Sequence, residues 1–179
     1  SSIGFTQMLV NGKLSPFLPK AKFIFKLYDL PAQLSITADY KAKIRYPSLN
    51  ELYWTPGGNE NLTPETSHNI SINAILGRKM ENLSFENKFE YYSIWASNFI
   101  QWQPTQNSFW KPRNIGNVVS RGFTNNLNID VFFKNEIALN LNIDYNFNRI
   151  SIAKSTKQLI YAPYSKFNFT SNFESKWIN

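Results

Sequence analysis

The chain has 179 residues, a formal net charge of +7, 42% hydrophobic residues, 16% aromatic residues and no cysteine. A chain of this length can bury the core of one domain without disulfide bonds or structural metal ions. The absence of cysteine excludes a disulfide framework, a zinc ribbon and a cysteine nucleophile, and one histidine, His68, is too few to complete a metal site. The basic residues are scattered, which argues against nucleic-acid binding.

Three more features of the sequence bear on the class of protein. No run approaches the roughly 20 apolar residues of a membrane-spanning helix. The chain begins Ser1-Ser2-Ile3, without an initiator Met or a signal-peptide core, which indicates a fragment or a processed product. The 23 asparagines and the aromatic share favour strands and turns over helices.

The predicted elements of the first third are strands. One is expected near residues 3–10, followed by the hairpin signal Asn11-Gly12. Weak alternation predicts a second strand over 23–27. Residues 33–46 alternate apolar and polar side chains without exception, so they are predicted to form a strand with one apolar face.

The middle of the chain continues the pattern with longer connections. A loop is expected over 47–67, and weak alternation predicts strands over 70–76 and 85–91, joined by a short connection at 77–82. A second long loop is expected over 103–116.

The last third contains three more predicted strands. Alternation is clear over 123–133 and 137–148, with a short connection at 134–136, and it returns over 166–177. Short and long connections alternate along the chain, which places the long loops at one end, as in a barrel with one functional rim.

The length of the strands favours a membrane barrel over a soluble sandwich. Several alternate for ten to fourteen residues, whereas soluble strands average about five to six and tilted membrane strands about 9–11. The polar positions of 140–148 suit a hydrated lumen. We predict an all-β, antiparallel up-and-down meander of about eight long strands, part of a transmembrane barrel. Aromatic residues that would suit interfacial girdles are Tyr46, Tyr53, Trp54, Trp95, Trp102 and Trp177.

The most specific signal is the block R-Y-P-S-L-N-E-L-Y-W at 45–54, followed by P-G-G-N-E-N-L-T-P-E-T-S at 56–67. It resembles a pattern of TonB-dependent outer-membrane receptors, with siderophore and cobalamin receptors as the nearest members. The resemblance covers roughly residues 20–177. Shorter stretches that also look like the family are 100–104, 110–115, 119–123 and 158–163.

The resemblance implies TonB-coupled uptake of a metal chelate or cobalamin-like ligand across the outer membrane of a Gram-negative bacterium. The family has a plug domain, a TonB-contact segment and a barrel of about 22 strands, and nothing in this chain resembles the first two. We therefore expect residues 1–179 to be a partial barrel from its second half, without the plug and the first and last strands. TonB would act through the missing plug region. Such a segment would expose two edges unless it closed on itself or paired with a copy.

Five residues in the long loops are candidates for ligand contact. Exposed aromatics can stack on a planar chelate or corrin ring, although they can equally lie in the lipid headgroup layer. Asn59 and Glu60 belong to the return from loop to strand, where Gly57-Gly58 is expected to allow a positive φ. Arg45 and Glu51 are expected to pair. The five candidates are Trp54, Asn59, Glu60, Trp102 and Trp110.

No enzyme signature is found: the sequence lacks a Gly-x-Ser-x-Gly elbow, a P-loop and a His-Glu-x-x-His motif. We expect no catalytic residue, cofactor or metal site. The alternatives are a soluble β-barrel or sandwich binding module and a passive outer-membrane pore. The membrane hypothesis requires outward-facing side chains at Leu34, Ile36, Ile44, Leu139, Leu141 and Ile143.

Overall fold

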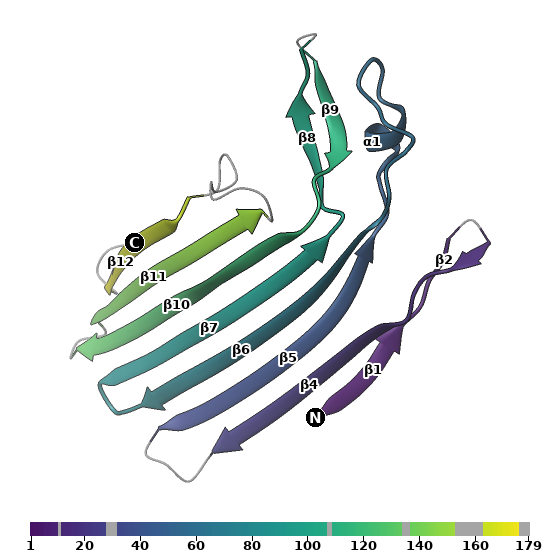
Figure 1. Cartoon of the computed structure of the whole chain (residues 1–179). Helices are drawn as coiled ribbons and strands as arrows, with labels where there is room; N and C mark the ends of the chain where they lie inside the picture. Colours follow the sequence, from purple (N-terminus) through teal and green to yellow (C-terminus); the bar gives the residue numbers. More distant parts are fainter. Residues whose placement is uncertain (11, 28–31, 107–108, 134–136, 153–162, 176–179) are drawn as a thin grey trace.

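The computed structural model describes residues 1–10, 12–27, 32–106, 109–133, 137–152 and 163–175. Eight strands form one antiparallel sheet in the order β1-β4-β5-β6-β7-β10-β11-β12 (Figure 1). This order follows the order of the strands along the chain. Their bounds are β1 Ser2–Thr6, β4 Leu18–Leu27, β5 Gln33–Arg45, β6 Glu65–Lys79, β7 Leu83–Ser97, β10 Val118–Phe133, β11 Ile137–Ile152 and β12 Ser165–Ser175.

The remaining elements belong to the connections. Strands β2 (Leu9–Val10) and β3 (Lys13–Leu14) form one small hairpin, and β8 (Ile100–Pro104) and β9 (Trp110–Asn114) form another. A short helix, α1 (Leu49–Tyr53), lies between β5 and β6. In the described part of the chain, no helix is long and apolar enough to cross a membrane.

The predicted meander of eight long strands is confirmed, with shifts at its ends. The structure has two strands, β1 and β2, where one first strand was expected, and Gln7 and Met8 separate them. The hairpin expected at Asn11-Gly12 is present around Gly12, whose φ is 74°, while Asn11 lies outside the described residues. Strand β6 continues to Lys79 because Arg78 and Lys79 still pair with β7, so the connection is shorter than predicted. The expected connection at 134–136, most of the stretch at 158–163 and Trp177 also lie outside the described residues.

Cross-strand register gives the sheet two chemically different faces. Directly paired residues lie on the same face, so the register carries the alternation of one strand to all the others. One row that crosses six strands is almost wholly apolar: Leu34, Leu76, Asn87, Leu127, Ile143 and Phe169. The neighbouring rows on the opposite face contain mostly amide, hydroxyl and charged side chains.

The sheet is curved (Figure 1), and the face that lines its hollows, the inner face, is the polar one. Hollows of about 440 and 570 Å³ are lined mostly by polar-face residues such as Asp39, Asn126 and Asp144. The six residues on which the membrane hypothesis depended all lie on the other, outer face. Their outward orientation confirms that hypothesis.

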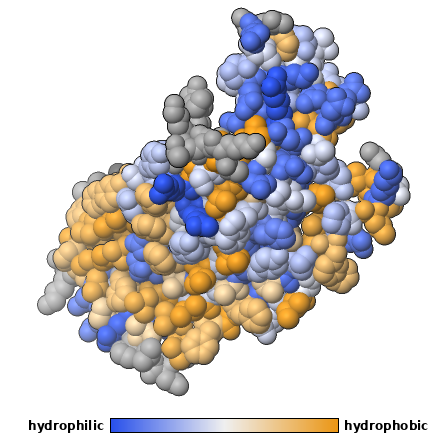
Figure 2. Space-filling model, in the orientation of Figure 1, coloured by the Kyte–Doolittle hydropathy of each residue, from blue (hydrophilic) through white to orange (hydrophobic). Residues whose placement is uncertain are grey.

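Among the described residues, no second layer of protein covers the outer face. Large apolar side chains remain exposed on it, including Phe25 at 58% and Phe169 at 57%. The buried apolar residues of the described chain are few: Leu18, Ala42, Leu62, Ile100, Pro112 and Val118. Figure 2 shows apolar residues gathered over the strands and hydrophilic residues over the β8–β9 hairpin. A soluble sandwich would pack such a face against a second sheet, whereas the eight described strands form a single layer.

The sheet is open in the described part of the chain. Strand β1 pairs only with β4, and β12 only with β11, which leaves one free edge on each. Closure of the sheet on itself, one of the two expected ways to cover its edges, is therefore not found among the described strands, which span an arc.

Candidate functional site

The two long connections stand at the same end of the sheet (Figure 1). One joins β5 to β6 and contains α1, and the other joins β7 to β10 and contains the β8–β9 hairpin. We call residues 46–64, 98–106 and 109–117 together the loop platform. The placement of both long loops at one end agrees with the prediction, but the helix and the hairpin inside them were not predicted.

Helix α1 is fixed at its start by a capping box. The backbone N–H of Glu51 donates to the Ser48 hydroxyl at 3.2 Å, and the backbone N–H of Ser48 donates to the Glu51 carboxylate at 2.7 Å. This reciprocal pair satisfies donors that a helix start leaves free. The spacing Ser48-x-x-Glu51 is the sequence signal that would have predicted the helix.

Arg45 connects that helix to the sheet. Its guanidinium donates to Glu51 from Nη1 at 2.9 Å and to Glu65 from Nε at 2.6 Å. The pairing with Glu51 confirms the sequence prediction, whereas the part played by Glu65 was missed. Burial alone would raise the pKa of Glu51, but hydrogen bonds from Arg45 and Ser48 outweigh it, and the pKa lies below its usual value.

Glu65 extends the same cluster to the second loop. Its Oε1 accepts from the backbone N–H of Ile100, the first residue of β8, at 2.5 Å. Both carboxylate side chains are about nine-tenths buried, with 10% exposure for Glu51 and 12% for Glu65. One arginine and two carboxylates therefore join the end of β5, helix α1, the start of β6 and the β8–β9 hairpin.

Amide side chains hold the two loops together further out. Asn59 donates from Nδ2 to the Pro112 carbonyl at 3.0 Å. Asn114 accepts from the Thr63 N–H and donates to the Thr63 carbonyl, both at 3.0 Å. Pro112 itself is fully buried. The platform is thus a packed unit whose loops are held to each other.

Two glycines allow close backbone contacts, Gly57 between the two loops and Gly58 within its own loop. A Cβ at Gly57 would overlap the Trp110 carbonyl oxygen, and a Cβ at Gly58 would lie 2.5 Å from the Leu52 carbonyl oxygen. The expectation that this pair supplies a positive φ is wrong, because the described glycines with positive φ are Gly12 and Gly116. Gly57-Gly58 is needed for space instead.

Three of the five predicted contact residues line one shallow hollow on the platform. Its volume is about 380 Å³, and its lining includes Trp54, Asn59 and Glu60 together with Lys111 of β9. Trp54 is 57% exposed and so presents a ring surface to solvent. Lys111 was not predicted, because only the fold brings β9 against this loop.

The other two predicted residues lie on the hairpin. Trp110 is 53% exposed and pairs with Pro104, while Trp102 is partly buried and pairs with Pro112. Neither lines the hollow beside Trp54. Of the expected girdle residues, Trp95 lies on the outer face of β7 near its loop end, whereas Trp54 and Trp102 belong to the platform.

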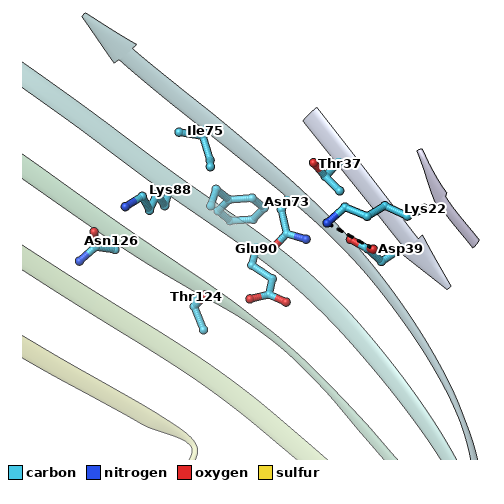
Figure 3. A pocket seen from close by; sticks show the side chains of 10 residues that line it. Lys22, Thr37, Asp39, Asn73, Ile75, Lys88, Glu90, Thr124 and Asn126 are labelled. Carbon is cyan, nitrogen blue, oxygen red and sulfur yellow. Dashed lines mark ion pairs between the residues drawn. The ribbon is translucent and has the colours of Figure 1, made fainter. Parts of the chain in front are cut away.

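Below the platform, the inner face carries a ladder of amides. Asn126 donates to Asp144, Asn140 to Asp130 and Asn142 to Asn128, each at 2.5 Å. In the hollow of about 440 Å³, the Nζ of Lys22 lies 4.0 Å from a carboxylate oxygen of Asp39, and Glu90 and Asn73 lie nearby (Figure 3). This face is polar and hydrogen-bonded, as a water-filled lumen requires.

The described residues contain no group of three or more His, Asp or Glu side chains that could hold a metal ion. His68 is exposed on β6, and its Nδ1 lies 2.8 Å from the hydroxyl of Tyr40. Its position at a strand surface agrees with the prediction for it.

A one-layer antiparallel sheet with an apolar outer face, a hydrated inner face and ordered loops at one end defines the wall of an outer-membrane β-barrel. The profile of the family described as "TonB dependent receptor-like, beta-barrel" matches residues 5–178. The chain therefore belongs to this family, whose members are outer-membrane proteins of Gram-negative bacteria.

The sequences of two curated relatives match part of the chain. The "Vitamin B12 transporter BtuB" of Photobacterium profundum is 27% identical over 99 residues, which are 53% of this chain and 16% of the relative. The protein with the same description from Vibrio vulnificus is 35% identical over 80 residues, 42% of this chain and 12% of the relative. The matched region is thus a small part of either relative.

Proposed function

We propose that the chain is part of the wall and rim of a larger receptor barrel that takes up a cobalamin-like ligand by TonB-coupled transport. The observation that carries the proposal is the packed loop platform above a polar inner face, in a chain of this receptor family. A ligand held at the platform would have a hydrated path along the amide ladder. The two free edges of the sheet are where further strands of the barrel would pair.

A cobalamin-like ligand is favoured over a siderophore by the descriptions of the two curated relatives. The chemistry of the platform suits a large planar chelate with polar substituents. The exposed rings of Trp54 and Trp110 offer stacking surfaces. Asn59, Glu60 and Lys111 offer hydrogen-bonding groups of both kinds beside one of them.

Cyanocobalamin binding to cells that express the full-length protein tests the ligand. We expect Trp54→Ala to weaken binding about tenfold, as the loss of one aromatic stacking contact does. Trp95→Phe is the matched control, because Trp95 lies on the outer face and should leave binding unchanged. Wild-type binding by Trp54→Ala and Trp110→Ala would contradict the assignment of the platform. Binding of ferric siderophores in place of cyanocobalamin would change the ligand class.

Energy coupling is tested separately in the same cells. TonB-coupled transport predicts that a protonophore abolishes accumulation of cyanocobalamin while binding at the cell surface persists. A passive pore predicts accumulation that the protonophore does not affect. The second result would replace active transport with the pore alternative.

A further inference from the structure

The outer face carries very few charged side chains, and all of them are arginines. Register and alternation place every aspartate, glutamate and lysine of the eight described sheet strands on the inner face. The outer face of the same strands carries Arg78, Arg121 and Arg149. Side chains of this face contact lipid, where a charge is costly, so each arginine needs a specific explanation.

Arg121 and Arg149 are direct cross-strand partners on β10 and β11. Two like charges in this arrangement repel each other. Both side chains are exposed, and in the described part of the chain no carboxylate lies within ion-pair distance of either guanidinium. The pair is therefore an uncompensated double positive charge on a surface that faces lipid.

The pair also lies at a particular depth. Each arginine is three residues from the loop end of its strand, since β10 begins at Val118 and β11 ends at Ile152. The Arg121 guanidinium lies 6.0 Å from the centre of the Trp95 ring, and Trp95 belongs to the row one step closer to the platform. Arg121 thus extends toward the rim, and His68, the partner of Trp95 on β6, adds a polar group there. This level is where the outer-leaflet headgroups meet the barrel.

We infer that Arg121 and Arg149 together bind a phosphate of an outer-leaflet phosphorylated glycolipid of the lipid A class. Two arginines at directly paired positions match the charge of one phosphate, and each guanidinium can donate two parallel N–H groups to the phosphate oxygens. The bound phosphate would remove the repulsion between the arginines. Trp95 and His68 would contact the sugar beside it.

Purified lipid A tests the inference on the full-length protein in detergent. Bisphosphorylated lipid A, dephosphorylated lipid A and phosphatidylglycerol are added separately, and bound lipid is counted by native mass spectrometry. We expect retention of bisphosphorylated lipid A and about a tenfold loss of its affinity in the double variant Arg121→Gln/Arg149→Gln. Equal binding of dephosphorylated lipid A or of phosphatidylglycerol would overturn the assignment.

Two further variants separate recognition from folding. Arg78→Gln removes the third outer-face arginine, which lies at the opposite end of β6, and should leave lipid A binding unchanged. Arg121→Lys/Arg149→Lys keeps both charges but removes the paired donors, so it should bind lipid A more weakly than wild type and more strongly than the Gln variant. A loss with Arg78→Gln equal to that of the double Gln variant would contradict a local site. The shift of the folded barrel on unheated gels confirms folding of each variant.

Discussion

The sheet and the loop platform are stabilised in different ways. In the sheet, pairing and alternation repeat along eight strands. In the platform and at the strand ends next to it, a few side chains each join segments far apart in sequence, such as Glu65 with Ile100 and Asn59 with Pro112. Substitutions in the sheet should therefore cost little individually, whereas substitutions in the platform should be costly and local.

The largest expected difference involves two glycines. Gly57→Ala places a Cβ far inside contact distance of the Trp110 carbonyl oxygen, whereas Gly77→Ala in β6 meets the Phe85 carbonyl oxygen at an ordinary 3.5 Å. We expect Gly57→Ala to destabilise the platform by about 3 kcal/mol and Gly77→Ala to change stability by less than about 0.5 kcal/mol. Protease cleavage of the loops on intact cells measures the first effect. Equal resistance of the two variants to the protease would contradict the expected difference between platform and sheet.

Arg45→Ala should have the next largest effect. It leaves Glu51 and Glu65 nearly buried without their cation, at a cost of about 2 kcal/mol in the stability of the platform. The control is Lys22→Ala, which removes an exposed pair at 4.0 Å on the inner face of the sheet and should cost less than about 0.5 kcal/mol. Urea unfolding followed by tryptophan fluorescence compares them. A loss of stability in Lys22→Ala equal to that in Arg45→Ala would contradict the expected difference between sheet and platform.

A polar pair on the outer face tests the sheet itself. Asn87 and Asn125 donate to each other's side-chain carbonyl groups at 3.3 and 3.1 Å. Asn87→Ala should cost about 1 kcal/mol, because it leaves the other amide unpaired toward lipid. The double variant Asn87→Leu/Asn125→Leu should recover most of that loss. A double variant less stable than the single one would show that the pair has another role.

Acid should lower the stability of the platform before that of the sheet. This is the smallest of the expected effects. The pKa of Glu51 in the folded protein lies below its ordinary value of 4.5. The resulting stabilisation is complete above that value and is lost as the pH falls through the folded pKa. Protease sensitivity of the loops should rise below about pH 4 in wild type, and Glu51→Gln should flatten this dependence. Glu60→Gln, an exposed control, should not.

Most of the sheet was predictable because its order is local and periodic. Thirteen alternating residues in β5 define a strand and its two faces, and register extends the same faces to its neighbours. The platform was less predictable, since its contacts join backbone carbonyls to side chains about 50 residues away, as between Asn59 and Pro112. No periodicity reveals such a contact.

The candidate site shows the same division. The Arg45–Glu51 pair was predicted from residues six apart, and the capping box was readable but missed. Lys111 and Glu65 could not be placed, because each joins the site only through the fold. Trp54, Asn59 and Glu60 lie together, yet their contact with ligand stays a prediction.

The orientation of the sheet is tested most directly by single cysteine substitutions along β11, in a background without other cysteines. We predict that cysteines at Asn140, Asn142 and Asp144 react with a water-soluble maleimide, whereas cysteines at Leu139, Leu141 and Ile143 react only with a lipid-soluble reagent. Strict alternation of this kind would establish a wall with lipid outside and water inside. The reverse alternation, or no alternation, would contradict it.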